Sequence, residues 1–376
     1  MEQKVIYNGQ VLTLTQFWAT GEPCLWITDP QQIGIPKMEF VGGYPNEYCI
    51  FLKNLTETEL AQIASLDGAP LDVREELRQF LTGKDNPMAL QDKKIMPPPW
   101  LAHREIERYS IGWRMGYGED YIYRFGDWLD TLSPEERTEY RNLFPEPVTW
   151  KGWWDDEDNG GVLEHGDFFV EVWQPEGRPK YTRQWLQQEF STERTRELCL
   201  FWGHQPAEDG SITKSCLSQW WMEDFWSIAD TYLCMEQYMM AGKAQLFGDE
   251  EIRKEILACS DPRQIKALGR KVRGFDQKVW DKFKYAIVLN GNWCKFSQNR
   301  DLREFLLSTG DSVLVEASPY DNIWGIRLAA SSPEAQAPTQ WRGQNLLGFA
   351  LMEVRDELRR VTQNEMLCDW STVWEQ

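Results

Sequence analysis

Histidine is scarce in this chain of 376 residues, which contains only His103, His165 and His204. These three are far apart in the sequence and have no cysteine at metal-ligand spacing, so a histidine-based metal site is not expected. A Ser-His-Asp triad also has few candidates for its base. The eight cysteines are dispersed and form no Cys-x-x-Cys pair, which argues against structural zinc. We therefore expect no metal, no cofactor, and chemistry based on carboxylates, amines and backbone groups.

Long apolar runs are also missing. No stretch approaches the length of about 18 residues that a membrane-spanning helix needs. The first ten residues, MEQKVIYNGQ, lack the apolar core of a signal peptide. We therefore expect a cytoplasmic protein with no membrane partner. The 20 tryptophans add apolar bulk, and we expect most of them in the core.

The net charge of −19 is unevenly distributed. Residues 1–190 contain 18 basic and 32 acidic side chains, whereas residues 191–376 contain 22 and 27. Such an acidic first half repels phosphate backbones. We therefore do not expect it to bind nucleic acid nonspecifically. The second half is close enough to neutral to contain a local basic pocket.

The length of the chain favours two domains. In the first half, an Asn-Gly turn between alternating residues predicts a hairpin, and Ser133 followed by Pro134 predicts a helix start. The Pro- and Gly-containing stretch PEGRPKYTRQW marks the approach to a domain boundary, which we place near residue 193. An acidic α+β domain of unknown function, with an unknown protein partner, is thus expected at 1–193. Its predicted elements are the hairpin within 4–18, strands at 47–55 and 161–174, and helices at 56–66, 72–81, 101–113 and 133–144.

The second half, 194–376, predicts a mixed α/β domain that is mainly helical. Acidic N-cap residues open several of its helices, and short apolar runs predict its strands. Its predicted strands are 198–202 and 312–318, and its predicted helices are 230–248, 249–259, 261–272, 279–296 and 345–361.

The stretch CMEQYMMAGKA places Glu236 and Lys243 seven residues apart on a predicted helix. Seven residues are nearly two turns, so the two charges lie about 20° apart in azimuth and share a largely apolar face. A charge on an apolar face needs a reason. The spacing alone also fits a plain Glu-Lys pair on a solvated face.

Two further constellations carry polar and aromatic groups. In VEASPYDNIWGI, a strand ends at Glu316 and a turn follows, which gathers Asp321, Trp324 and Gly325 at one mouth. A strand-to-loop corner with Trp324 as a packing anchor explains the pattern equally well.

The segment LSQWW offers Ser218 and Gln219 as hydrogen-bonding groups and Trp220 as a wall, although tryptophan pairs usually serve a core. Asn345, just before the last helix, is either part of a phosphate-binding helix start or part of a cap.

Residues 199–360 resemble the NADAR superfamily, also called YbiA-like. Seven segments occur in the family's order: CLFWGHQP, CLSQWW, MEQYMMAGKA, DPRQIKALGRKV, WDKFKYAIVLNGNWCKF, LREFLLSTGDSVLVEASPYDNIWGI and RGQNLLGFALMEVRDELR. Residues 1–190 show no such resemblance. The sequence departs from the common family pattern at Gln219, where many members have Asn, and at Arg327, where many have Gly.

The resemblance implies an N-glycosidase that hydrolyses the N-glycosidic bond of an ADP-ribose-type substrate. It implies that Glu236 and Lys243 are catalytic, with a carboxylic acid delivering a proton and an amine capturing the opened ribose as a Schiff base. It also implies that Ser218, Gln219, Trp220, Glu316, Asp321, Trp324, Gly325 and Asn345 bind substrate.

The preferred reaction is removal of ADP-ribose from guanine in nucleic acid, so that ADP-ribosylated DNA is an expected partner. Hydrolysis of riboflavin-pathway intermediates is an alternative, and so is a noncatalytic sensor of ADP-ribose or NAD derivatives.

Overall fold

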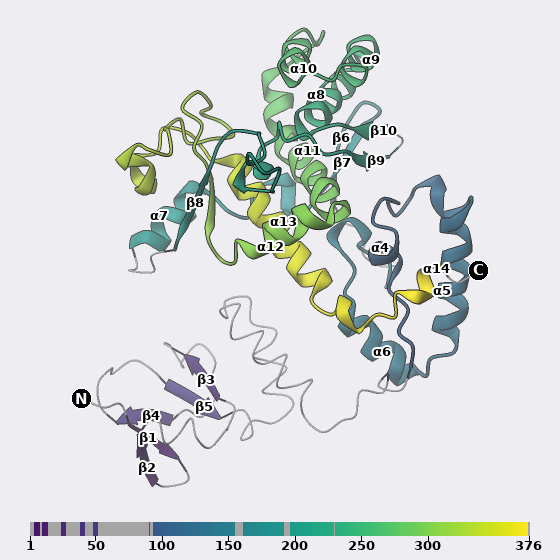
Figure 1. Cartoon of the computed structure of the whole chain (residues 1–376), viewed down its shortest axis with the longest axis vertical. Helices are drawn as coiled ribbons and strands as arrows, with labels where there is room; N and C mark the ends of the chain where they lie inside the picture. The colour runs from purple at the N-terminus through teal and green to yellow at the C-terminus, as the bar shows by residue number, and fades with distance from the viewer. Residues whose placement is uncertain are drawn as a thin grey trace. The chain divides into compact units, whose positions relative to one another are not determined.

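The computed structural model describes residues 4–7, 10–13, 24–27, 38–41, 48–51, 90, 93–154, 161–191, 196–228 and 230–374. Contacts divide the chain into two compact units, Met1–Asp92 and Lys93–Gln376. Figure 1 shows the elements of both units. Among the described helices, none has both the length and the apolar character needed to span a membrane.

The first unit contains a five-stranded antiparallel sheet in the order β2-β1-β4-β5-β3. The predicted hairpin is confirmed, because β1 and β2 pair with Tyr7 opposite Gln10 across a two-residue connection. The predicted helices 56–66 and 72–81 lie outside the described residues. The strands are β1 (Lys4–Tyr7), β2 (Gln10–Thr13), β3 (Cys24–Ile27), β4 (Met38–Val41) and β5 (Tyr48–Phe51).

The second unit begins with short helices and a hairpin. Its helix α6 starts as predicted, because Ser133 and Glu136 form a reciprocal capping box ahead of Pro134. The helix predicted at 101–113 is wrong, since α4 ends at Ala102 and the chain turns, with the Trp113 indole donating to the Glu107 carbonyl. The elements are α4 (Pro99–Ala102), η3 (Ile111–Trp113), α5 (Tyr117–Asp130), α6 (Pro134–Leu143), η4 (Val148–Trp150), β6 (Gly161–His165), β7 (Phe168–Val172), η5 (Pro175–Gly177) and α7 (Arg183–Ser191).

The remainder of this unit is the predicted α/β, mainly helical part of the chain. Two strands, β8 and β11, pair in parallel with Glu316 opposite Phe201 at their carboxyl ends. Helices predominate around them. The elements are β8 (Leu198–Phe201), η6 (Lys214–Leu217), β9 (Phe225–Ser227), β10 (Asp230–Tyr232), α8 (Met235–Leu246), α9 (Glu250–Leu257), α10 (Pro262–Gly269), α11 (Gln277–Gln298), α12 (Arg300–Ser308), β11 (Val313–Glu316), η7 (Pro333–Gln336), η8 (Pro338–Gln340), α13 (Leu346–Thr362), η9 (Glu365–Leu367) and α14 (Ser371–Trp374).

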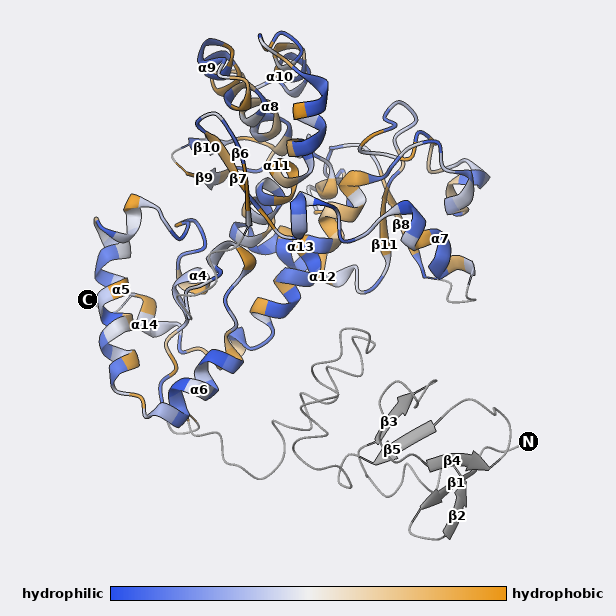
Figure 2. Ribbon diagram, turned by 180° about the vertical axis from the view of Figure 1, so that it is seen from behind, coloured by the Kyte–Doolittle hydropathy of each residue, from blue (hydrophilic) through white to orange (hydrophobic). Residues whose placement is uncertain are grey.

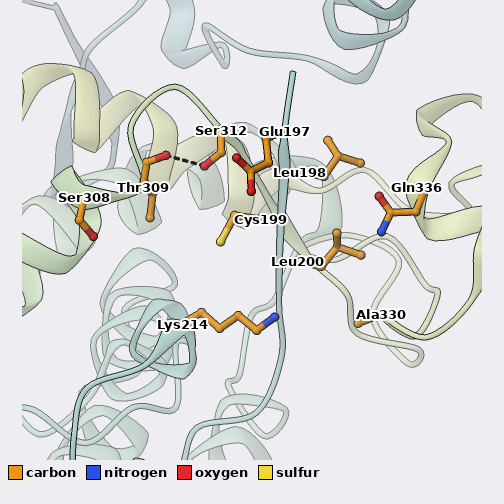
Figure 3. Close-up of a pocket in the computed structure, with 10 residues that line it drawn as sticks. All are labelled: Glu197, Leu198, Cys199, Leu200, Lys214, Ser308, Thr309, Ser312, Ala330 and Gln336. Atoms are coloured by element: carbon orange, nitrogen blue, oxygen red, sulfur yellow. Dashed lines mark hydrogen bonds between the residues drawn. The ribbon is translucent and has the colours of Figure 1, made fainter. Parts of the chain in front are cut away.

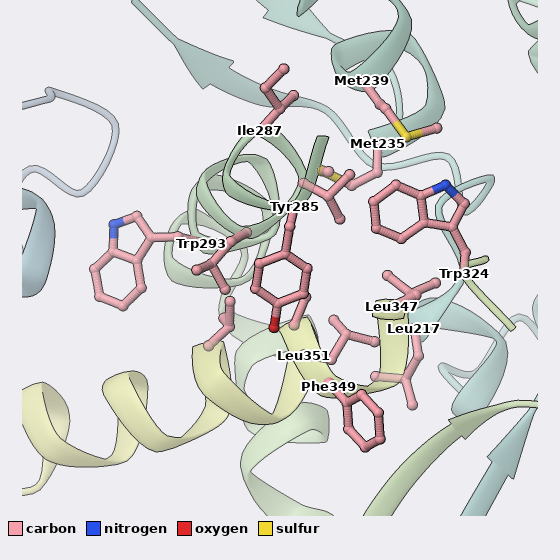
Figure 4. Close-up of a cluster of buried hydrophobic side chains, with 14 of the residues drawn as sticks. Leu217, Met235, Met239, Tyr285, Ile287, Trp293, Trp324, Leu347, Phe349 and Leu351 are labelled. Atoms are coloured by element: carbon pink, nitrogen blue, oxygen red, sulfur yellow. The ribbon is translucent and has the colours of Figure 1, made fainter. Parts of the chain in front are cut away.

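The long helix α11 lies at the centre of the core, packed against α8 and α13. Figure 4 shows side chains from these helices meeting one another, among them Met235, Tyr285 and Phe349. All three are buried. Figure 2 shows the apolar character of β8 and β11 against the hydrophilic surface of α6. The apolar face of α8 is therefore buried in the core, and only part of this helix is left to build a site.

Residues 93–191 are bonded to α11 and α13 through polar groups. The backbone N–H of Lys180 donates to the Glu353 carboxylate at 2.7 Å, and that of Val148 donates to Glu357 at 2.6 Å. The Trp173 indole donates to Asn290 at 3.1 Å. The compact unit therefore begins at Lys93, and the predicted boundary near residue 193 falls inside it.

We expect residues 93–376 to fold without residues 1–92, and a fragment 195–376 to be less stable. Hydrogen bonds to a charged group contribute about 1.5–3 kcal/mol each, and the shorter fragment loses those to Glu353 and Glu357. Its midpoint of thermal unfolding should be lower by at least about 6 °C. Calorimetry of both fragments measures this difference, and equal midpoints would restore a boundary near residue 193.

Candidate active site

Glu236 is positioned in the first turn of α8 by the backbone before it. Cys234 is the extended N-cap residue, so the backbone N–H groups of the first turn have no partner within the helix. The N–H of Glu236 instead donates to the carbonyl of Gln219 at 2.8 Å. This bond joins the start of α8 to the segment Ser218–Trp220, and the Glu236 side chain is only 2% exposed.

The Glu236 carboxyl group is only partly satisfied. Its Oε2 accepts the indole N–H of Trp220 at 3.1 Å, whereas its buried Oε1 has no partner among the described residues. Burial raises the pKa of Glu236, and Asp321 adds to the increase, while Lys266 and the Trp220 bond oppose it. A carboxyl group in this state keeps its proton to a higher pH than an exposed one.

A second carboxyl group, Glu316, lies at the carboxyl end of β11. Its Oε2 is buried and has no partner in the described part of the chain. The pKa of Glu316 is raised to about 8, mainly by burial and to a smaller extent by Asp321 and Glu236. Lys266 opposes this increase. The two glutamates and Asp321 thus form one electrostatic cluster, which we call the carboxylate site, and Lys266 is the cation that acts on both glutamates.

The loop after β11 is held by Asp321. Its Oδ1 accepts the backbone N–H groups of Ile323 and Trp324, each at 2.8 Å. Gly325 is required for packing, because a Cβ there would lie 2.8 Å from the carbonyl oxygen of Glu316. Trp324 is 9% exposed and belongs to the core cluster of Figure 4. Asp321 acts electrostatically on Glu316, and the prediction that Asp321, Trp324 and Gly325 bind substrate beside Glu316 stays a prediction.

The side chain of Asn345 is hydrogen-bonded to strand β11. Its Oδ1 accepts the N–H of Glu316 at 2.9 Å, and its Nδ2 donates to the carbonyl of Leu314 at 2.9 Å. It is fully buried in the left-handed conformation, with φ of 59°. Asn345 therefore positions β11, and its predicted contact with substrate stays a prediction.

The segment Ser218–Trp220 forms a wall of the carboxylate site. The Ser218 hydroxyl accepts a hydrogen bond from the backbone N–H of Trp220 at 3.1 Å. The buried Gln219 Oε1 has no partner among the described residues. The Lys266 ammonium lies 5.7 Å from the Trp220 ring centroid. Gln219 and Trp220 therefore stay candidates for substrate contact, whereas the Ser218 hydroxyl is engaged locally.

Lys243, the second predicted catalytic residue, makes its polar contact with the end of α10. Its ammonium donates to the carbonyl of Gly269 at 2.8 Å and lies 4.1 Å from the centroid of the Phe275 ring. Burial lowers the pKa of Lys243, as its apolar surroundings predict. Its other contact is with the Trp280 ring, whose centroid lies 5.7 Å from the ammonium, and a catalytic role for Lys243 beside Glu236 stays a prediction.

Two lysines in this region escaped the sequence analysis. Lys266 lies on α10, within the family segment DPRQIKALGRKV, yet nothing in its spacing marked it out. Lys295 on α11 is fully buried and donates to the carbonyls of Cys216 at 2.7 Å and Ser218 at 3.0 Å. Burial lowers the pKa of Lys295 to about 8. When a lysine lies within a mainly apolar helix, the sequence does not show which backbone carbonyls it will bond.

Arg327, where many family members have Gly, lies at a position with an unusual backbone conformation. It is an exposed residue in the left-handed region, with φ of 55°. Glycine adopts this region without steric cost, which explains its use there by other members. The side chain of Arg327 is therefore added at a turn, outside the buried part of the carboxylate site.

A hollow of about 460 Å³ lies beside β8. Figure 3 shows its lining, including Glu197, Lys214 and the hydrogen-bonded pair Thr309 and Ser312. None of the predicted site residues lines it. Within the described part of the chain, no three His, Cys, Asp or Glu side chains are arranged to hold a metal ion.

Comparison with known proteins places the carboxylate site within a matched region. Residues 200–359 match the NADAR domain. The chain is 52% identical to an N-glycosidase of Acanthamoeba polyphaga mimivirus over 126 residues, which covers 34% of this chain and 74% of the viral protein. It is 33% identical to the chloroplastic riboflavin biosynthesis protein PYRR of Zea mays over 135 residues, covering 34% of this chain and 20% of that protein.

One solved structure is also similar. The NMR structure of the Escherichia coli protein YbiA matches 44% of this chain and 86% of its own length, at 27% identity and a TM-score of 0.36. All the predicted site residues lie within the sequence span of the family match.

Glu316 makes stability depend on pH. Its pKa is about 8 in the folded protein and about 4.5 in the unfolded chain, so between these values the folded state retains a proton that the unfolded state loses. Raising the pH through this window therefore destabilises the fold. We expect Glu316→Gln to remove that dependence, so that its thermal midpoint relative to wild type increases from pH 5 to pH 8.

The exposed Glu255→Gln is the control, and its midpoint should follow that of wild type at each pH. A constant difference between Glu316→Gln and wild type across this range would contradict the protonated state of Glu316.

Proposed function

Because the chain belongs to the NADAR family, which includes a named N-glycosidase at 52% identity, it is a hydrolase of N-glycosyl bonds, and we propose that its substrate is an ADP-ribose-type nucleotide. The observation that supports the proposal is the buried Glu236 carboxyl group with one unpaired oxygen, beside Glu316 and Asp321. An N-glycosidic bond needs a proton donor and a negative group close to one carbon, and this cluster supplies both.

In the proposed reaction, the bond between the anomeric carbon and the base nitrogen breaks with its electrons moving to the base. Protonated Glu236 delivers a proton to the base or to the ring oxygen. The positive charge left on the sugar is stabilised by the neighbouring carboxylate of Asp321. Water then adds to the anomeric carbon and loses a proton to the Glu236 carboxylate, which restores the starting state.

Charge favours a phosphorylated sugar at this position. Lys266 and Arg270 both act electrostatically on Glu236, so two cations border the carboxylate site. Trp220 provides an aromatic face beside Lys266. A nucleotide phosphate near these cations and a ribose against the tryptophan would place the anomeric carbon toward Glu236.

Within this class, our preferred substrate is ADP-ribose attached to guanine in DNA, in the cytoplasm. The acidic chain repels nucleic acid at long range, so recognition would depend on the modified nucleotide itself. A second candidate is a riboflavin-pathway intermediate, which the similarity to the maize protein favours. A noncatalytic sensor is disfavoured by the buried acid pair, since binding alone does not need a protonated carboxyl group.

A direct test incubates the protein separately with ADP-ribosylated DNA, with free NAD and with a pyrimidine riboside phosphate, and measures release of the base. Release of ADP-ribose from the DNA alone supports the preferred substrate. Release only from the riboside phosphate supports the riboflavin-pathway candidate. Absence of release from all three, with tight binding of ADP-ribose, would identify a sensor.

We expect Glu236→Gln to reduce turnover by about 10²-fold or more, because the amide cannot deliver the proton. The amide retains the shape of the side chain, so the thermal midpoint should stay within a few degrees of wild type. Single-turnover rates of base release measure the effect, with the exposed Glu255→Gln as the control. Full activity in Glu236→Gln would remove this residue from the mechanism.

Capture of the opened ribose by an amine gives an imine that cyanoborohydride reduces to a stable adduct. The sequence assigned this amine to Lys243, but Lys266 is the ammonium that acts on both glutamates and has no hydrogen bond among the described residues. We therefore expect mass spectrometry to locate any adduct on Lys266, and Lys266→Arg to abolish it.

An adduct on Lys243 would instead restore the assignment made from the sequence. Absence of an adduct from both lysines under turnover, with activity surviving in Lys266→Arg, would leave Glu236 and water as the whole mechanism.

A further inference from the structure

A cavity of about 480 Å³ lies behind α8, on the face of the helix away from Glu236. Tyr238, Gly242 and Gln245 line it, and they lie about 200°, 240° and 180° around the helix from Glu236. The two sites therefore use opposite faces of one helix. A volume in this range is typical of a cavity for a small ligand.

Part of the lining of this cavity comes from residues that precede the NADAR match at 200–359. Residues 104–111 and the β6–β7 hairpin line one side, whereas Asn290, Trp293 and Cys294 of α11 line the other. Figure 1 shows β6 and β7 beside α11. The cavity thus exists only because residues 93–191 pack on the NADAR part of the chain.

Aromatic side chains form much of the lining. Trp100 and Trp150 are buried, whereas Tyr109 and Phe169 are mostly exposed and lie at the edge of the cavity. Flat aromatic walls favour a planar ligand that stacks against them.

Three of the charged groups of the cavity are already engaged. Glu107 accepts the Ser227 hydroxyl at 2.9 Å and the Ile228 N–H at 2.8 Å. Arg108 donates to two backbone carbonyls, including that of Gly152 at 2.9 Å. Arg104 is paired with Glu365 at 2.5 Å. These groups are fixed in place by the protein itself.

Glu171 differs from them because its carboxyl group has no partner among the described residues. Its backbone carbonyl accepts Asn290 Nδ2 at 2.8 Å, which fixes this part of β7 against α11. The pKa of Glu171 is raised to about 7, mainly by burial and to a smaller extent by Glu107, while Arg108 opposes the increase. A bound group that donates hydrogen bonds would favour its ionised form.

We propose that this cavity is a second binding site, for a planar ligand whose edge carries two adjacent N–H donors of the guanidine type, and that Glu171 accepts them. Such an edge occurs on a guanine base and on a guanidinium compound, and both stack on aromatic rings. Three acidic residues, Glu107, Asp167 and Glu171, outnumber the two arginines Arg104 and Arg108, so the cavity disfavours a phosphate.

Four other titratable groups of the cavity have pKa values that burial keeps outside the range between pH 6 and pH 8. Burial raises the pKa of the Cys294 thiol and of the Tyr232 and Tyr238 hydroxyls, and lowers that of Arg104 only to about 10. Asp167, Glu107 and Arg108 are the remaining charged groups that face the cavity.

The test is calorimetric titration of the whole protein with guanosine, inosine and agmatine at pH 6 and pH 8. Inosine lacks the 2-amino group and should bind more weakly than guanosine. For a pKa of about 7, the ionised fraction of Glu171 rises about tenfold between these pH values, and affinity should rise by about the same factor. Binding of guanosine alone identifies a base as the ligand, and binding of agmatine alone identifies a guanidinium compound.

Variants separate the two sites. Glu171→Gln should weaken binding at pH 8 by about tenfold or more and abolish the pH dependence, and Phe169→Ala should weaken it without affecting the fold. Glu164→Gln, exposed on the same hairpin, should have no effect. Failure of both guanosine and agmatine to bind would overturn the proposal, and so would binding that is lost in Glu236→Gln but unchanged in Glu171→Gln.

Discussion

The buried ammonium of Lys295 is the interaction on which the geometry of the carboxylate site depends. It donates to the carbonyls of Cys216 and Ser218, and so fixes the segment that follows. That segment presents the Gln219 carbonyl to the backbone of Glu236 and the Trp220 indole to its carboxyl group. Because a buried ammonium without partners is costly, these carbonyls have little freedom to move. The position of the proposed acid is therefore set by a lysine that is itself fully buried.

On the β11 side of the carboxylate site, one buried side chain again holds the main chain in place. Asn345 occupies a left-handed conformation so that its amide can bond both Leu314 and Glu316 across β11. Gly325 then allows the following loop to return against the strand. The result is that Glu236 and Glu316 come from different elements but share Asp321 and Lys266 as neighbours. Both carboxyl groups are buried, which is why both hold protons to higher pH.

Sequence reasoning succeeded where a local pattern has a local cause. The capping box at Ser133, the hairpin of β1 and β2, and the mainly helical character after residue 196 all follow from such patterns. It failed where the cause was a distant partner. The period that placed Lys243 beside Glu236 could not reveal that Gly269 offers a carbonyl, nor that the main chain at Lys180 docks on Glu353. Main-chain donors carry no side-chain signature, so the Pro- and Gly-containing stretch before residue 193 resembled a linker.

The way residues 93–191 are attached has a consequence for how such a chain can change over time. The acceptors at that junction, Glu353 and Glu357, are side chains of α13, within the NADAR match, whereas the donors facing them are backbone N–H groups. Backbone groups are supplied by any residue except proline. Substitutions at Val148 and Lys180 to residues other than proline can therefore keep these two bonds, although side chains such as Trp173 also attach the segment. The lining of the cavity behind α8 can thus change while α8 stays as it is.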